Sequence, residues 1–140
     1  RATDSAGEDG IAADDTGPPE PDEFLAWLTD GIRERRLELN QVGALVHVVP
    51  EGLLLVSPRI FKVYAGTDPE SGRHWEYVQR RLLRKRWHRV HARGRGIFEY
   101  QVSGERKTSR LKGIVLTDPA TRLNLPLPEA NRHLTRVTPL

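Results

Sequence analysis

The sequence predicts an α+β domain of winged-helix type, with three helices, a β-hairpin and a small antiparallel wing. Three observations predict this class. Hydrophobic periodicity gives the order helix, hairpin, helix, helix and then a short β-ribbon. The third helix is the most basic of the three. In a winged helix, a relative of the helix-turn-helix, the last helix before the ribbon enters a DNA groove.

Residues 1–21 are predicted to be an acidic, disordered linker. They are rich in Gly, Ala, Asp and Pro and lack hydrophobic periodicity, so they cannot bury enough surface to offset the entropy of ordering. Asp22 can cap a first helix, which we expect to end near Asn40. The apolar residues of this helix recur at the spacing of one helical face: Phe24, Trp27, Leu28 and Ile32.

Two β-rich runs, residues 44–49 and 53–57, follow the first helix. The turn signal Pro50-Glu51-Gly52 separates them and predicts a hairpin. A short second helix then begins with Pro58 in its first turn. Its apolar side is made of Ile60, Phe61 and Tyr64.

The third predicted helix, residues 72–86, has two distinct faces. At 100° per residue, Trp75, Val78 and Leu82 share the face that we expect in the core. The opposite face carries cationic residues and one tyrosine: Arg73, Tyr77, Arg80, Arg84 and, less centrally, Arg81. This helix therefore offers guanidinium groups to solvent.

Beyond residue 86 the pattern changes to strands, predicted at residues 87–91, 97–102 and 111–117, with glycine turns between them. Residues 22–119 would then form the winged-helix-like domain. Residues 120–140, which contain three prolines, are predicted to be an extended tail.

The composition limits the classes of protein to which the chain can belong. The chain has 140 residues, of which 37% are hydrophobic, which suits one domain. It contains no cysteine, so disulfides and thiolate metal sites are excluded. Its apolar runs are too short to span a membrane, and the acidic start is unlike a signal peptide, so we expect a cytoplasmic location. Because methionine is absent, we also expect a piece of a longer polypeptide.

The net charge of +3 hides an asymmetry. Residues 1–23 hold eight acids against Arg1, a net charge of −7, so the remaining residues carry +10. Residues 73–95 hold nine bases against Glu76, a net charge of +8. A local field of this size argues for a polyanionic partner.

We predict that this partner is DNA, because the planar guanidinium fork can give two hydrogen bonds to a phosphate or a guanine edge. The alternative is a solvated helical face. Tyr77 could stack on a base or be an exposed tyrosine without a role, and Trp87 is more typical of a core anchor than of a stacking platform. The predicted DNA contacts are Arg73, Tyr77, Arg80, Arg81, Arg84, Lys85, Arg93, Arg95, Arg106 and Lys107.

The sequence offers little support for metal binding or catalysis. A site made of His74, His88 and His91 is disfavoured, because an i, i+3 pair on a strand points to opposite faces and the arginines would repel a cation. No nucleophile-base-acid spacing or phosphate-binding glycine loop is present. We therefore expect no catalytic residue, metal, cofactor or small-molecule substrate. His47, in an apolar strand, is expected to sit at the edge of the core with a bonded ring nitrogen.

Several segments carry a family resemblance: residues 24–28, 40–49, 52–58, Ile60-Phe61 and Tyr64, then Trp87-His88, 98–104, 111–113 and Asp118-Pro119. Over about residues 22–120 the chain resembles the C-terminal domain of TraI-type conjugal-transfer nickases, the MobH class of relaxases of integrative conjugative elements and some plasmids. The resemblance implies a winged-helix-like fold and a role in holding DNA or relaxosome proteins. It also implies that nicking belongs to an upstream metal-dependent region, whose motif is absent here. Asn40, Gly43, Pro58 and Gly113 look like fold-determining members of the motif, through capping and turn geometry.

Two alternatives to DNA binding stay open. The wing and the hairpin could dock a relaxosome protein, or the basic face could bind the parent's own catalytic domain. The acidic residues 1–21 could in addition compete with DNA for the basic face, or serve only as a solvated spacer.

Overall fold

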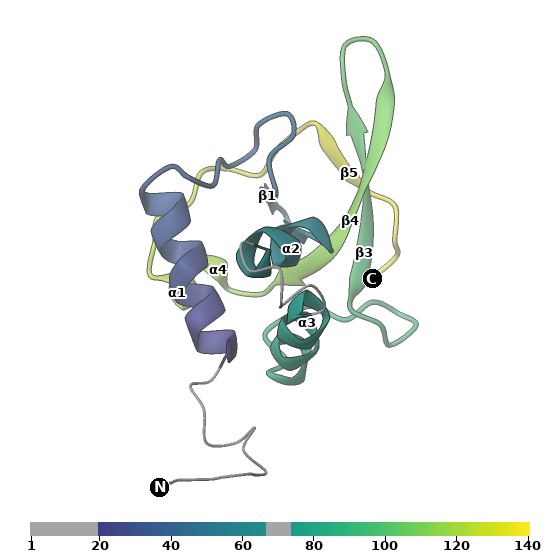
Figure 1. Cartoon of the computed structure of the whole chain (residues 1–140). Coiled ribbons are helices and arrows are strands. Elements are labelled where there is room, and N and C mark those ends of the chain that lie inside the picture. Colours follow the sequence, from purple (N-terminus) through teal and green to yellow (C-terminus); the bar gives the residue numbers. More distant parts are fainter. Residues whose placement is uncertain (1–19, 67–73) are drawn as a thin grey trace, which may run out of the picture.

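The computed structural model describes residues 20–66 and 74–140. In chain order, its elements are α1 (Glu20–Arg33), β1 (Val46–Val49), β2 (Gly52–Val56), α2 (Arg59–Ala65), α3 (His74–Arg84), β3 (Ile97–Ser103), β4 (Thr108–Leu116), α4 (Pro119–Leu123) and β5 (Leu134–Arg136). Figure 1 shows the helices gathered on one side of the sheet and the β3–β4 hairpin projecting beyond it. No helix in these two ranges combines the length and apolar character that crossing a membrane requires.

The five strands form one antiparallel sheet in the order β1-β2-β4-β3-β5. The pairing of Val49 with Gly52 fixes the β1–β2 hairpin and leaves Pro50 and Glu51 as its two-residue turn. β2 then pairs with the second half of β4, from Gly113 to Leu116. β5 adds to the other edge, beside β3. The sheet is therefore built mainly from pairings between segments far apart in the sequence.

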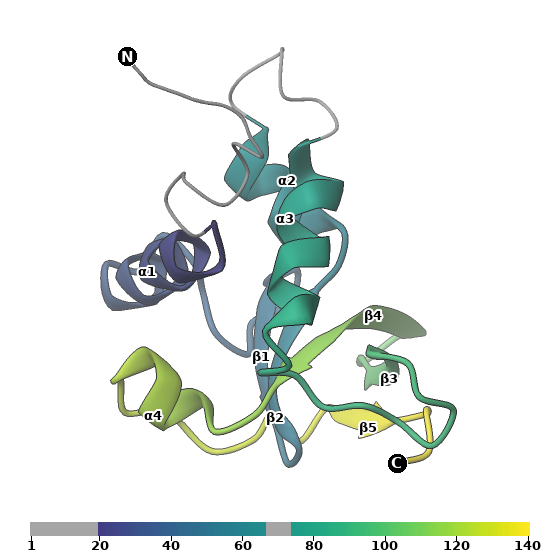
Figure 2. The ribbon, with the colours of Figure 1, turned by 90° about the horizontal axis from the view of Figure 1, so that it is seen from below.

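Two cores lie on the two faces of this sheet, because successive strand residues point to opposite sides. On β2, Leu53 and Leu55 join the helices in the larger core, whereas Leu54 faces the smaller one. The smaller core combines residues of both edge strands with the strands between them: Val49, Leu54, Phe98, Tyr100, Val115 and Leu134. Because β1 and β5 both reach this cluster, the sheet must curl around it. Figure 2 shows this curvature, which makes the sheet a half-barrel.

The helices cover the convex face through an aromatic cluster. The rings of Phe24 and Phe61 stack with centroids 5.0 Å apart, and Tyr64 meets Phe24 edge-on at 5.2 Å. α3 packs against both α1 and α2 through Val78 and Leu82, which are fully buried. The amphipathic faces predicted for the three helices are therefore the faces that build the core.

A polar cluster joins the β1–β2 turn to the far edge of the sheet. The Glu51 carboxylate accepts a hydrogen bond from the Tyr100 hydroxyl at 2.5 Å and pairs with Nη1 of Arg136 at 2.6 Å. Burial, together with the neighbouring Glu51 carboxylate, raises the pKa of Tyr100, so the phenol stays protonated and keeps donating. These contacts connect β1–β2, β3 and β5 across the concave side of the half-barrel.

The predicted winged-helix architecture is wrong. The structure has four described helices and a five-stranded curled sheet, instead of three helices and a small wing. The order of elements along the chain resembles that of a winged helix, but β2 pairs with β4 and β5 pairs with β3, so the hairpin and the ribbon form one continuous sheet. α3 packs on both α1 and α2.

Three individual elements also differ from prediction. α1 ends at Arg33 instead of near Asn40, and the chain turns back so that the Leu37 amide donates to the Gly31 carbonyl at 2.9 Å. Residues 87–91 form no strand, apart from a bridge between His88 and Leu116. The predicted extended tail contains the end of α4 and all of β5. The β1–β2 hairpin, α2 and α3 are confirmed within a few residues.

Candidate nucleic-acid interface

The outer face of α3 is cationic and open to solvent. Val78 and Leu82 direct one side of this helix into the core, so the opposite side carries Arg80 and Arg84, one turn apart and both exposed. Neither arginine forms an ion pair with any residue that the structure describes. Lys85 continues this surface past the end of the helix. Guanidinium groups so placed can meet a polyanion without first breaking an internal contact.

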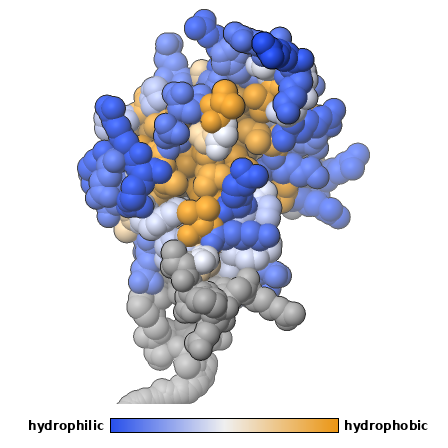
Figure 3. Space-filling view, turned by 45° about the horizontal axis from the view of Figure 1, so that its top comes forward, coloured by the Kyte–Doolittle hydropathy of each residue, from blue (hydrophilic) through white to orange (hydrophobic). Residues whose placement is uncertain are grey.

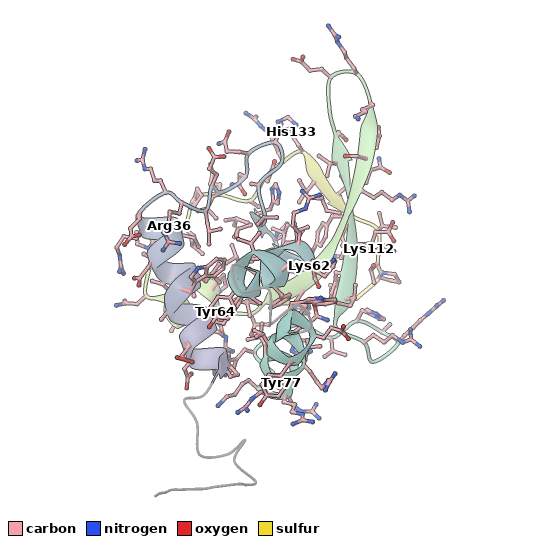
Figure 4. All side chains as sticks on the ribbon, in the orientation of Figure 1. Arg36, Lys62, Tyr64, Tyr77, Lys112 and His133 are labelled. Atoms are coloured by element: carbon pink, nitrogen blue, oxygen red, sulfur yellow. The ribbon has the colours of Figure 1, made fainter. Side chains whose placement is uncertain are left out.

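Tyr77 and Arg81 are engaged with each other. Nη1 of Arg81 donates to the Tyr77 hydroxyl at 2.5 Å, and the guanidinium carbon lies 5.3 Å from the centre of the tyrosine ring. Both side chains are half-buried. Figure 4 places Tyr77 on the side of α3 that faces away from the sheet. Because Arg81 is held against Tyr77 by this i, i+4 contact, it adds less exposed positive charge to α3 than Arg80 and Arg84 do.

Trp87 is a packing platform immediately after α3. The ammonium of Lys85 and the guanidinium of Arg122 lie 5.4 and 5.6 Å from the centre of its ring. The Trp87 carbonyl accepts from the Thr117 amide at 2.8 Å, and the side chain is half-buried. These contacts agree with the anchoring role weighed above for Trp87.

The loop that leads from α3 to β3 carries further exposed cations. It is closed by a hydrogen bond from the His91 amide to the Arg95 carbonyl at 2.9 Å, and Gly94 adopts a φ of +78° within it. Arg93 and Arg95 are exposed on this loop. Sequence reasoning missed Arg86 and Arg89 as members of the site, although both are exposed in the same segment and their charges are plain in the sequence.

Arg106 and Lys107 lie apart from the α3 surface. They occupy the tip of the β3–β4 hairpin, whereas the 91–96 loop leads into the opposite end of β3. Figure 1 shows the tip projecting away from α3. At roughly 3.3 Å per residue, the seven residues of β3 separate the two groups by about 20 Å. Arg80, Arg84 and Lys85 thus share one surface, Arg93 and Arg95 follow on the loop that leads from α3 to β3, and the hairpin tip lies at the other end of β3. Arg73 lies outside the described residues.

His47 is the buried polar centre of the region beside β1. Its Nε2 donates to the Ala44 carbonyl at 3.0 Å, and its Nδ1 accepts from Nδ2 of Asn131 at 3.2 Å. Burial lowers the pKa of His47, although the hydrogen bond to Ala44 acts in the opposite direction. Both ring nitrogens are satisfied only by the neutral form. His47 thus has the core-edge position and bonded ring nitrogens expected from the sequence.

We expect the protein to lose stability as the pH falls below about 6.5, the usual histidine pKa. The unfolded chain binds a proton at His47 in this range while the folded chain does not, so acid favours unfolding. The cost is at most about 1.4 kcal/mol for each pH unit below that value. Urea unfolding at pH 7.5 and pH 5.5 measures it, and His47→Gln should reduce the pH dependence. His88, whose pKa is lowered by burial and by Arg86, contributes in the same direction. An equal pH dependence in His47→Gln would contradict this assignment.

Metal ligands do not gather in the part of the chain that the structure describes: no three His, Asp or Glu side chains there are grouped to hold an ion. The side chain of His74 lies outside that part. Nδ1 of His88 is buried without a hydrogen-bond partner, but His88 belongs to no such group of three ligands among the described residues.

Comparisons with known proteins agree with this fold. A family profile described as "Putative conjugal transfer nickase/helicase TraI C-term" matches residues 19–136. The crystal structure of the C-terminal domain of Salmonella enterica protein STY4665 is similar, with a TM-score of 0.66 and 24% sequence identity over 84% of this chain and 96% of that one. No curated protein matches the chain.

Proposed function

Because the chain belongs to the family of TraI C-terminal domains, named for conjugal transfer nickase/helicases, we propose that it is a non-catalytic accessory domain that binds DNA for a conjugative relaxase. Contact is chiefly between arginine and phosphate. DNA carries one charge per ~1.7 Å of duplex, and cations that displace its condensed counterions gain affinity that does not depend on sequence. The domain would hold DNA while another region of the relaxase cuts it.

One observation carries this proposal. Arg80 and Arg84 project from α3 into solvent, with no acidic partner among the described residues, and the loop between α3 and β3 adds the exposed Arg93 and Arg95. Exposed cations on most proteins are interspersed with acids, which weakens their field. Glu76, in the first turn, is the one acidic residue of α3. The unpaired arrangement supports phosphate binding over a neutralised, merely solvated face.

Removing the two helix charges tests the proposal. We expect Arg80→Gln combined with Arg84→Gln to weaken DNA binding about tenfold on every DNA sequence, transfer-origin DNA included, because phosphate contacts carry no sequence information. Glutamine keeps a helix propensity close to that of arginine, so α3 should persist. Fluorescence polarisation with labelled duplex and single-stranded DNA at fixed low salt measures the change.

A matched pair provides the control. Arg35 and Arg36 are also exposed arginines, but they follow α1, Arg36 is paired with Glu34 at 3.1 Å, and Figure 4 shows Arg36 far from Tyr77 and α3. Changing both to glutamine removes the same charge from the chain and should leave DNA affinity within about twofold. Equal losses from the two double variants would reduce the effect to net charge and contradict a defined α3 interface.

A further inference from the structure

A groove opens at the end of the half-barrel that lies away from α3. It has a volume of about 580 Å³ and lies between residues 40–44 on one side and the outer half of the β3–β4 hairpin on the other. Its apolar lining comes from Val42, Ala44, Val102 and Leu111. Val102 and Leu111 also pack against the smaller core, so the floor of the groove continues that core to the surface. Figure 3, with this end turned forward, shows apolar surface flanked by hydrophilic residues.

Val42 stands fully exposed on the rim of this groove, on a loop that is firmly held. The loop is a tight turn, in which the Ala44 amide donates to the Gln41 carbonyl at 3.0 Å and Gly43 adopts a φ of +79°. Asn40 anchors it, accepting from the Val48 amide at 2.7 Å and donating to the Glu129 carbonyl at 3.2 Å. A fixed loop that presents an apolar side chain to water loses little entropy when a partner covers it. Val42 is therefore a preorganised apolar contact.

The rim of the groove is predominantly cationic. Arg106 and Lys107 stand on the hairpin wall, and His133 lies next to this wall, where its carbonyl accepts a hydrogen bond from the Ser103 amide at 2.8 Å. Figure 4 places His133 beside the loop at this end of the molecule. Glu105 is the one acid in the lining, and none of these four side chains forms an ion pair within residues 20–66 and 74–140. Such a rim favours a partner with carboxylates.

The edge of β4 beside the groove is unpaired. The Ser57 amide donates to the Lys112 carbonyl at 3.0 Å, and the pairing of β2 with β4 goes no further toward the tip than Gly113. Because the strand period is two, Thr108 and Arg110 direct their backbone groups to the same side as Lys112. These groups have no backbone partner among the described residues. An open strand edge is a template for the addition of another strand.

We propose that this groove binds an extended segment of a partner protein with alternating apolar and acidic residues, which adds as a strand to residues 108–111 of β4. Its apolar side chains cover Leu111 and Val102 and contact Val42. Its carboxylates face Arg106, Lys107 and His133. Nucleic acid fits less well, because the lining contains no Phe, Tyr or Trp on which bases could stack.

Titration of the ¹⁵N-labelled chain with short peptides tests this proposal. The probe is a blocked octapeptide of alternating glutamate and valine. Two matched peptides replace every glutamate with lysine or every valine with serine. We expect the first peptide alone to shift the amide signals of Val42, residues 108–111 and His133. Signals that move on α3 instead, equal binding of the lysine peptide, or no binding at millimolar peptide would each overturn the proposal.

Variants separate the elements of the site. Val42→Asp and the pair Arg106→Glu with Lys107→Glu should each weaken peptide binding about tenfold, whereas Val63→Asp, at an exposed valine of α2, should not. Arg110→Pro removes an outward amide that an edge strand can lose without unfolding, so it should weaken binding more than Arg110→Ala. Equal binding by the two Arg110 variants would exclude strand addition.

Three further measurements separate this proposal from the DNA proposal and from other occupants of the groove. Arg80→Gln with Arg84→Gln should leave peptide affinity unchanged, so failure of the DNA proposal and failure of this one are separable. Duplex DNA that shifts the same groove signals and displaces the peptide would assign the groove to nucleic acid and overturn the proposal. Peptide binding that appears only after removal of residues 1–19 would assign the groove to the chain's own acidic segment. This result would also overturn the proposal.

Discussion

Replacing Glu51 with alanine is expected to lower the free energy of unfolding by about 3 kcal/mol. The Glu51 side chain is only 10% exposed, and it satisfies two donors, the Tyr100 hydroxyl and the Arg136 guanidinium. Alanine would leave a buried phenol and a partly buried cation without their acceptor. It would also release the contact that joins the β1–β2 turn to β3 and β5, the strands that close the curl of the sheet.

Urea unfolding measures this loss, and Glu99→Ala is the matched control. Glu99 in β3 also pairs with an arginine, Arg110 of the neighbouring β4, at 2.7 Å, but the Arg110 side chain is 58% exposed. Exposed pairs contribute little, so this control should change stability by no more than about 0.5 kcal/mol. Tyr100→Phe should lie between the two variants, because one donor is removed together with its need for an acceptor. Similar losses for Glu51→Ala and Glu99→Ala would refute the role given to the Glu51 cluster.

Gly113→Ala is expected to destabilise the fold by about 3 kcal/mol. A Cβ atom at this position would lie 2.0 Å from the Leu55 carbonyl oxygen, in the middle of the β2–β4 pairing. The clash involves backbone, which cannot move aside without breaking the ladder. Thermal unfolding measures the loss.

Gly94→Ala separates the effect of space from that of glycine itself. Gly94 has a φ of +78° but open space around its Cα, so alanine there should cost only about 1 kcal/mol, from backbone strain. Equal losses at Gly94 and Gly113 would show that lost chain flexibility, and not close approach of β2 to β4, explains the requirement for glycine.

Local structure in this chain could be predicted from the sequence. The turn at Pro50 and Glu51, the start of α2 next to Pro58 and the buried face of α3 all follow from residue types and periodicity. Gly43 does serve a turn, and Asn40 holds the loop before β1 through its side chain. Gly113, by contrast, is needed within a strand for close approach of Leu55, not in a turn.

The arrangement of these elements could not be predicted, because it depends on pairings that periodicity does not encode. Nothing in the β-rich runs specifies that β2 pairs with β4, and β5 is too short to give a clear alternation. The end of α1 depends on Leu37 packing against Gly31, where a Cβ would lie 2.6 Å from the leucine side chain. The same order of elements therefore fits a winged helix until the long-range pairing is known.

For the candidate site, too, the local features could be predicted from the sequence and the long-range arrangement could not. Exposure of Arg80 and Arg84 follows from the helical wheel, and the contact of Tyr77 with Arg81 follows from their i, i+4 spacing. The separation of Arg106 and Lys107 from α3 depends on the course of the hairpin. The groove combines residues 40–44, the hairpin and residues near 131, so no local pattern could indicate it.

The salt dependence of DNA binding tests the α3 interface most directly. For duplex DNA, the logarithm of the binding constant should fall linearly with the logarithm of the salt concentration, and the slope for Arg80→Gln with Arg84→Gln should be shallower than that of the unchanged chain by about two units. Such a difference would count two lost phosphate contacts. Parallel lines for the two proteins would mean that neither arginine meets phosphate, and the proposed interface on α3 would be wrong.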